Sequence, residues 1–384
     1  MSRKRICIIS YSPIKSDGRV LRQIEYLAPD YDLTVVGFGA QPDIPGVDWQ
    51  LFPDRDPLLA KIIRNGLQTV GRVIPAAYDL LEVARARYWI TRRAVDKRPD
   101  AVLADDLTAL PIAAHLARKF GAKLVFDAHE YSPLEQETPK FKRLETPNRT
   151  YLIRKYAPQA AATITVCAPI AERYEREFGF RPMVVMSAPK LRTVADHPIN
   201  PERIRLIHHG KYSPDRQPEV MIHALAQADK RFELYFMLVA TEAEIEPLRR
   251  LADEVAPGRV FFVPPVPPAQ VVSEIAKYDA GFYVLAPTNY NNQIALPNKF
   301  FDFIVAGLAV VIGSSPAMAQ LVREYEFGVV ASSFAAEAAA AALNSLTVDQ
   351  LISMRAQACV AAQAINADTE MAKLITLFKQ LLGE

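Results

Sequence analysis

The chain has 384 residues and a formal net charge of +2; half of its residues are apolar and 23% are charged. This composition excludes an intrinsically disordered chain, and the small net charge excludes a globally basic nucleic-acid-binding protein. Because the length exceeds what one hydrophobic core usually serves, we expect two domains.

The cysteines and the apolar runs indicate the compartment. Cys7, Cys167 and Cys359 lack the spacing of a metal site or a redox motif, which is typical of reduced thiols in a cytoplasmic protein. The apolar run Ile6–Ile9 is too short for a signal peptide, and no run approaches the roughly 20 apolar residues that span a bilayer. We therefore expect a cytoplasmic protein without a membrane-spanning segment.

In the first half, short apolar segments alternate with amphipathic ones, which predicts an α/β domain with a parallel sheet. The expected strands are Arg5–Ser10, Leu33–Phe38, Ala101–Ala104, Lys123–Asp127, Ala162–Val166 and Pro182–Met186. The expected helices are Val20–Leu27, Leu107–Phe120 and Pro169–Phe178. The following segment, Ser187–Arg203, is polar, contains three prolines and is the expected linker.

The same alternation returns in the second half. The expected strands are Ile204–His208, Leu234–Val239, Val260–Val263, Ala280–Leu285, Ala309–Ile312 and Val329–Ala331. The expected helices are Pro218–Ala228, Ala243–Val255, Pro268–Lys277, Asn298–Ala306, Ala317–Glu324, Ala335–Leu346, Val348–Asn366 and Thr369–Leu382. The sequence thus predicts two doubly wound Rossmann-like domains, 1–190 and 204–366, that face a cleft, and a C-terminal helix in 367–384 that packs back on the first domain.

Two cations follow the first strand of the second domain. Gly210, which permits close backbone approach, is followed by Lys211 and, five residues later, by Arg216. A diphosphate needs such a clamp because its charge must be neutralised where water is partly excluded. The alternative is that both cations are solvated loop residues.

A second anion-binding feature opens the helix that begins near Pro297. Pro297 is tolerated at a helix start, where Asn298 and Lys299 surround free backbone N–H groups. Asp302 lies three residues beyond Lys299 on the same face, so phosphate and ribose hydroxyls could each find a partner. The alternative is an ordinary capped helix of a βαβ unit. The chain has no glycine-rich phosphate loop, which argues against ATPase and NAD chemistry.

In the first domain, polar residues follow three strands. The first strand leads into a loop that contains Asp17, Gly18 and Arg19, and two others lead into Asp106 and into His129-Glu130. A histidine beside a carboxylate at a strand end suits proton transfer or binding of sugar hydroxyls. Asp106 could instead be a helix N-cap, and Glu130 a charge at a helix entry. No carboxylate pair or histidine cluster has the spacing of metal ligands, so we expect no metal.

Residues 61–98 hold nine basic residues and three acidic ones, with apolar residues at helical intervals. A basic amphipathic surface suits anionic lipid headgroups. The alternative is a solvated helical face whose apolar side belongs to the core. Nucleic acid is a weaker option, because the rest of the chain lacks a basic track.

Four segments together resemble a glycosyltransferase of the GT-B fold, close to glycosyltransferase family 4. They are DGRVLRQIEYL, DAVLADDLTALPIAAHLARKFGAKLVFDAHEYSP, GKYSPDR and LPNKFFDFIVAGLAVV, and their order and spacing span nearly the whole chain. In GKYSPDR, Lys and Arg are exchanged relative to the pattern of the family.

The resemblance implies a retaining, metal-independent transferase without a cofactor, whose donor substrate is a nucleotide-diphosphate sugar. By position, Lys211 and Arg216 would hold the donor phosphates, Asp302 the ribose, and His129 would lie near the transferred sugar, which makes His129, Lys211 and Arg216 the expected catalytic residues. The Asp17–Arg19 loop would approach the phosphates or the acceptor. Ile294 stands where the family has its first glutamate, and Asn292 or Gln293 could substitute for it through hydrogen bonds.

The predicted function is a cytoplasmic hexosyltransferase that moves a sugar to a saccharide or lipid-linked acceptor in surface polysaccharide or glycolipid assembly, at the inner membrane face if 61–98 bind lipid. One alternative is a GT-B-fold sugar-nucleotide epimerase. Another is a catalytically silent subunit that binds a nucleotide sugar.

Overall fold

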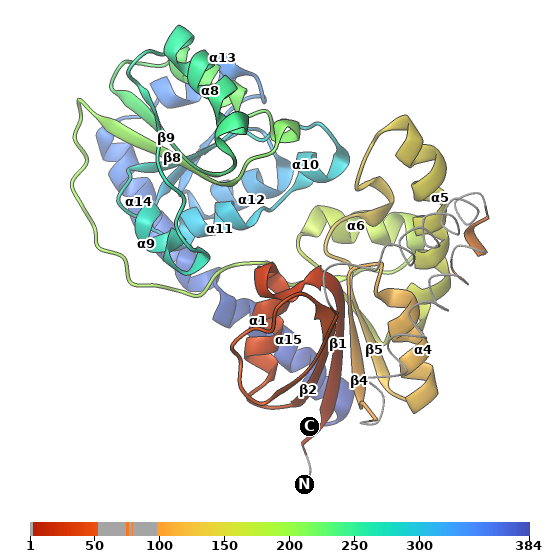
Figure 1. Cartoon of the computed structure of the whole chain (residues 1–384). Coiled ribbons are helices and arrows are strands. Elements are labelled where there is room, and N and C mark those ends of the chain that lie inside the picture. Colours follow the sequence, from red (N-terminus) through yellow and green to blue (C-terminus); the bar gives the residue numbers. More distant parts are fainter. Residues whose placement is uncertain (1–2, 53–73, 77–78, 80–97) are drawn as a thin grey trace. The chain divides into compact units, whose positions relative to one another are not determined.

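The computed structural model describes residues 3–52, 74–76, 79 and 98–384. The chain forms two compact units, unit 1 with residues 1–186 and 371–384, and unit 2 with residues 187–370 (Figure 1). Each unit is a parallel sheet with helices on both faces, so the predicted α/β class with two Rossmann-like sheets is confirmed. Most of the basic stretch 61–98 lies outside the described residues.

The sheet of unit 1 has seven parallel strands in the order β3-β2-β1-β4-β5-β6-β7. They are β1 (Arg5–Pro13), β2 (Asp32–Phe38), β3 (Val47–Phe52), β4 (Ala101–Asp105), β5 (Lys123–Asp127), β6 (Ala162–Thr165) and β7 (Met183–Val184). The helices are α1 (Gly18–Leu27), α4 (Leu110–Phe120), α5 (Pro139–Tyr156), α6 (Ala168–Phe178) and the last helix of the chain, α15 (Ala367–Leu382). Short 3-10 turns η1 (Ile14–Ser16), η2 (Ser132–Leu134) and η3 (Ala157–Gln159) connect them.

The C-terminal helix α15 completes the core of unit 1. Its apolar stripe of Met371, Leu374 and Phe378 is buried in one cluster with residues of α1, β1, β2, β4 and β5. This spacing of three and four residues places the three side chains on one face of the helix. Figure 1 shows α1 and α15 on the same side of the sheet and α4 on the other.

The sheet of unit 2 has six parallel strands in the order β10-β9-β8-β11-β12-β13. They are β8 (Ile204–Lys211), β9 (Phe232–Val239), β10 (Val260–Phe262), β11 (Ala280–Tyr283), β12 (Ala309–Ile312) and β13 (Gly328–Val330). The helices are α7 (Glu219–Gln227), α8 (Glu242–Val255), α9 (Val271–Ile275), α10 (Tyr290–Ile294), α11 (Asn298–Val305), α12 (Pro316–Tyr325), α13 (Ala336–Asn344) and α14 (Val348–Ala364), with 3-10 turns η4 (Pro214–Arg216) and η5 (Pro268–Gln270).

In both sheets the strand order reverses beside the first strand, between β1 and β4 in unit 1 and between β8 and β11 in unit 2. Open α/β sheets bind ligands outside the carboxyl ends of the strands at such switch points. The register of unit 1 places Ser10 opposite Asp105, and Asp105 opposite Asp127, at this edge. The fold therefore singles out one edge of each sheet as the place to look for a site.

Among the described residues, no helix has both the length and the apolar composition that crossing a bilayer requires.

Candidate functional site

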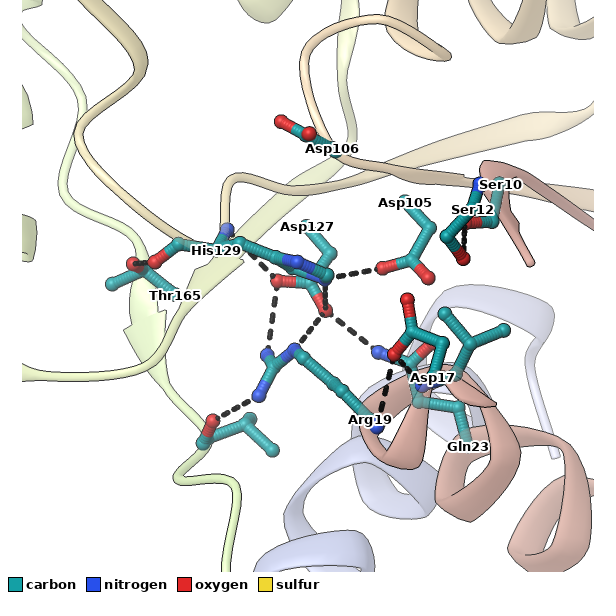
Figure 2. A network of polar contacts seen from close by, with 12 residues as sticks. Ser10, Ser12, Asp17, Arg19, Gln23, Asp105, Asp106, Asp127, His129 and Thr165 are labelled. Carbon is teal, nitrogen blue, oxygen red and sulfur yellow. Dashed lines mark hydrogen bonds and ion pairs between the residues drawn. The ribbon is translucent and has the colours of Figure 1, made fainter. Parts of the chain in front are cut away.

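The switch point of unit 1 holds a cluster of buried charges around His129 (Figure 2). The Nε2 atom of His129 lies 2.5 Å from Oδ1 of Asp105 and 3.5 Å from Oδ2 of Asp127. Both carboxylates are fully buried, whereas 23% of the His129 side chain is exposed. The residue has a φ of +43°, and its carbonyl accepts a hydrogen bond from the Thr165 hydroxyl. The backbone thus holds the ring between the two carboxylates.

Arg19 belongs to this cluster because its guanidinium group binds the carboxylate of Asp127. Its Nε and Nη2 atoms donate to the two oxygens of Asp127 at 2.7 and 2.9 Å, and its Nη1 donates to the carbonyl of Val185. Gln23 adds a third donor to Asp127 at 2.6 Å. We expected the Asp17–Arg19 loop to approach the phosphates or the acceptor, but the Arg19 guanidinium is buried, because helix α1 begins at Gly18 and points this side chain at the sheet.

The cluster fixes the charge of His129. Burial opposes a positive charge on the ring, but Asp105 and Asp127 outweigh it and raise the pKa of His129 well above 6.5. Burial likewise opposes ionisation of Asp127, but Arg19 first and then His129 lower the pKa of Asp127 below its usual value. Burial raises the pKa of Asp105 to about 6. The two carboxylates thus favour the charged, hydrogen-bond-donating form of His129, which suits the binding of sugar hydroxyls, one of the two roles expected from the sequence.

Asp105, Asp127 and His129 also offer three ligand atoms within 4.8 Å of one another. Sequence spacing did not show this group, because the parallel register brings Asp105 beside Asp127. Two features argue against a metal ion here: both oxygens of Asp127 already accept from Arg19, and Nε2 of His129 contacts Asp105. Freedom from metal stays a prediction.

The other predicted residues of unit 1 have local backbone roles. Asp17 caps α1 by accepting from the N–H groups of Arg19 and Val20, and Gly18 is the first residue of that helix. Asp106 has a φ of +75° and accepts from the N–H of Leu107, whereas α4 begins only at Leu110. Its alternative reading as the N-cap of α4 is therefore wrong.

Glu130 directly follows His129. Its carbonyl accepts a hydrogen bond from Tyr174, and the turn η2 begins two residues later, so the structure places Glu130 beside the cluster and before a helical turn.

In unit 2, the switch point holds a buried lysine at the start of α11. Lys299 is 5% exposed, and its Nζ lies 3.1 Å from Nε2 of His208 and 4.7 Å from the ring centre of Tyr283. Gly210 has a φ of +110°, and a Cβ atom there would meet Lys299 at 3.4 Å. Gly210 is thus needed for its backbone conformation, while a Cβ atom there would make only an ordinary contact with Lys299.

Arg216 lies close to the same group. Its positive charge lowers the pKa values of Lys299 and His208, in each case after burial as the main cause. A chain of hydrogen bonds supports its turn: Nδ2 of Asn292 donates to the hydroxyl of Thr288 at 2.8 Å, and Thr288 donates to the carbonyl of Asp215 at 2.9 Å. Asn292 therefore supports the turn that carries Arg216.

The surroundings of Lys211 differ from those of Arg216 and Lys299. Its side chain is exposed, and it adds to the effect of Thr241 in lowering the pKa of Glu244 at the start of α8. The charge of Arg216 therefore acts on Lys299, whereas the charge of Lys211 acts on Glu244.

The remaining residues of unit 2 belong to α11 and its approach. Pro297 is the N-cap residue and makes no side-chain cap, and Asn298 is exposed at the first helical position. Asp302 lies 3.6 Å from Nε2 of His209. Ile294 is buried, so an apolar side chain fills the position of the family's first glutamate.

Sequence reasoning missed three contributors: Asp105, His208 and Tyr283. Asp105 is the first of two aspartates at a strand end, but only the second, Asp106, was predicted to belong to the site. His208 is the last residue of the expected strand Ile204–His208, and Tyr283 lies inside the expected strand Ala280–Leu285. The contact between His208 and Lys299 joins positions 91 residues apart, which no local pattern reveals.

Comparison with known proteins adds independent information. Residues 19–189 match the family model of the glycosyl transferase 4-like domain. No curated protein sequence matches the chain.

Solved structures match the whole chain. Sucrose-phosphate synthase from Thermosynechococcus elongatus has a TM-score of 0.74 at 15% identity and covers 99% of this chain and 100% of its own. HepE from Anabaena in complex with UDP has a TM-score of 0.69 at 15% identity, with 98% and 100% covered. A trehalose 6-phosphate synthase from Burkholderia multivorans has a TM-score of 0.68 at 11% identity, with 100% and 99% covered. At these identities the likeness establishes the fold, which is GT-B as predicted.

Proposed function

We propose that this chain is a glycosyltransferase that uses a nucleotide-diphosphate sugar as donor. The observation that carries the proposal is the buried Lys299 at the start of α11, at the edge of the unit 2 sheet where β8 also leads into the turn of Arg216. The Arg216 guanidinium, the Lys299 amine and the backbone N–H groups at the start of α11 suit a diphosphate. Support also comes from the match of residues 19–189 to a glycosyl transferase 4-like domain, and from structural neighbours crystallised with UDP and UDP-glucose.

In the proposed reaction, the bond between the anomeric carbon and the diphosphate oxygen breaks, and its electron pair leaves with the nucleoside diphosphate. An acceptor hydroxyl oxygen forms the new bond and loses its proton to a leaving phosphate oxygen. Arg216 and Lys299 neutralise the charge that develops on the diphosphate. His129, a charged donor, binds a hydroxyl of the transferred sugar.

The finer parts of the proposal are that the anomeric configuration is retained, as in family 4, and that no metal is needed. A hexose is the group transferred to a saccharide or lipid-linked acceptor, in cytoplasmic assembly of a surface polysaccharide or glycolipid. Contact with the inner membrane face through residues 61–98 belongs to the same proposal, although most of those residues lie outside the described part of the chain.

Thermal-shift measurements with UDP, GDP, ADP and CMP and their sugar conjugates test donor binding, because a ligand of the native state raises its apparent stability. Product analysis of the stabilising conjugate, with and without a pool of saccharide acceptors, then tests transfer. We expect a nucleoside diphosphate in both cases, slow hydrolysis without acceptor and a glycoside with acceptor. An altered nucleotide sugar without acceptor would instead show an epimerase. Binding without hydrolysis or transfer would show a silent subunit, for which the buried Ile294 provides a reason.

A further inference from the structure

Lys299 is a buried cation-forming group without a carboxylate partner. Its Nζ contacts the imidazole of His208 at 3.1 Å and lies over the ring of Tyr283, and it forms no ion pair within the part of the chain that the structure describes. A buried ammonium normally requires an opposite charge to offset its loss of hydration. This lysine lacks that partner in the free protein.

The hydrogen bonds of His208 determine what it offers to Lys299. Its Nδ1 lies 3.1 Å from the carbonyl oxygen of Phe282, which can only accept, so Nδ1 carries a hydrogen and donates. In the neutral ring, Nε2 then has a free lone pair that points at Lys299. His208 thus accepts from the lysine nitrogen and contributes no charge.

The other titratable groups around Lys299 include an arginine, an aspartate, two histidines and a tyrosine. His208 and His209 come from β8, Tyr283 from β11, Arg216 from η4 and Asp302 from α11 itself. Burial and then Arg216 lower the pKa of Lys299 well below 10.5, and Asp302 opposes this shift without cancelling it. Burial lowers the pKa of His209 to about 3, and the pKa of His208 is also lowered, so both rings are neutral above pH 7.

We propose that Lys299 is an uncharged amine in the free protein and takes up a proton from solvent when a diphosphate binds beside Arg216, with His208 as the residue that positions it. The inference rests on the proposed function. The bound diphosphate supplies the missing negative charge, and the resulting ammonium donates to a phosphate oxygen. Donor binding is thereby coupled to one proton.

The coupling has a definite sign. Binding raises the pKa of Lys299, so affinity is constant below the pKa of the free protein and falls as the pH rises through it. The loss is up to about tenfold per pH unit until the pKa of the complex is reached. The phosphate's own second ionisation, with a pKa of about 6, has the opposite sign and is complete above pH 8. Measurement above pH 8 therefore isolates the lysine.

The test is isothermal titration calorimetry of the full chain with UDP, GDP or ADP, whichever binds, at pH 8.5 in buffers of different ionisation enthalpy. We expect uptake of up to about one proton by the wild type. Lys299→Met and Lys299→Arg should take up none, since one side chain cannot ionise and the other stays charged. Lys230→Met, which removes an exposed lysine that belongs to neither site, should keep the uptake. Binding without proton uptake, or equal uptake by both Lys299 variants, would overturn the inference and leave the proposed function standing. No binding of any of the three would refute both.

The positioning role of His208 has its own readout. His208→Phe keeps an aromatic ring against Phe236 but removes the acceptor, and we expect affinity to fall about tenfold. His208→Gln restores an acceptor, so it should recover most of this loss. Equal affinities of the two variants would show that the ring acts by packing alone.

Discussion

Arg19 and Asp127 form a buried ion pair that supports the His129 cluster, so losing one partner strands the other. We predict that Arg19→Met lowers the free energy of unfolding of unit 1 by about 3–5 kcal/mol at pH 7, because Asp127 then remains buried with its main counter-charge gone. Urea unfolding, followed by a probe in unit 1, measures the loss. Arg176→Met is the matched control, since Arg176 is exposed, and it should change stability by less than about 0.5 kcal/mol.

The pH dependence of this pair has a sign of its own. In the wild type the pKa of Asp127 is lowered, so its stabilisation is present above the unfolded pKa of about 4 and is lost as the pH falls through the folded value. Without Arg19, burial raises the folded pKa, and the variant gains stability on acidification. The difference in the free energy of unfolding between wild type and Arg19→Met should therefore become smaller from pH 7 to pH 5. A constant difference would contradict the buried-charge explanation.

Asp105 is the second residue on which the charge of His129 depends. We predict that Asp105→Asn lowers the pKa of His129, because one carboxylate fewer then offsets the burial of the ring. The ring-proton NMR titration of His129, one of six histidines, reports this directly.

Asp106→Asn is the matched control for that measurement. Figure 2 shows the Asp106 side chain directed away from His129, and asparagine tolerates its positive φ. The pKa of His129 should hardly change in this control. An unchanged pKa in Asp105→Asn would mean that Asp127 alone holds the charge.

At the scale of elements, the sequence predicted what was strongly periodic and missed what was not. The predicted strands and helices have counterparts in the structure, whereas β3, α5 and α10 were missed. Strand β3 alternates its polar residues but is only half-buried along its length, and α5 contains Pro147 and many charges. Helix α10 is five residues long, and the side chain of Asn289 caps it within an asparagine-rich segment that resembles a loop. These elements depend on tertiary contacts or capping more than on pattern.

The same limit applies to the sites. His129, Arg216 and Lys299 could be found because each follows a strand end or opens a helix. The partners of His129 and Lys299 could not, because Asp105 and His208 reach them through sheet register and helix packing over many residues. A sequence thus indicates where strands end. The charge state of a side chain at such an end depends on the residues that the fold brings into contact with it.

A cavity under helix α15 should destabilise unit 1 and leave unit 2 unchanged. Phe378 is fully buried and packs against Tyr31 with ring centres 6.2 Å apart. We predict that Phe378→Ala lowers the free energy of unfolding of unit 1 by about 3–5 kcal/mol. Because the cavity lies in the core of unit 1, amide hydrogen exchange should accelerate in β1 and β2 and stay unchanged in β8 and β9.

Gln380→Ala is the control on the same helix, because Gln380 is exposed, and it should leave exchange unaffected. Equal acceleration in both units of Phe378→Ala would show that the units unfold together.

At the scale of the whole molecule, two sheets of the same strand order carry different chemistry at equivalent edges. The switch point of unit 1 holds two carboxylates, an arginine that they neutralise, and a charged histidine with its ring partly exposed. The switch point of unit 2 holds Arg216 and the buried amine of Lys299, which forms no ion pair with a carboxylate among the residues that the structure describes. Nucleotide affinity should therefore depend on unit 2, whereas unit 1 should contribute to the transfer step.

This division gives the last prediction. Arg216→Ala should lower turnover more than tenfold and also weaken binding of the nucleoside diphosphate, because it removes a charge from the phosphate group. If the nucleotide binds to unit 2 as proposed, His129→Ala should lower turnover to a similar degree but leave nucleoside-diphosphate affinity within about twofold. Steady-state rates and calorimetry on the same preparations separate the two effects. Arg250→Ala, an exposed arginine of α8 paired with Glu246, is the control and should alter neither quantity. If His129→Ala weakens nucleotide binding as much as Arg216→Ala does, the two clusters bind the same part of the donor and the division is wrong.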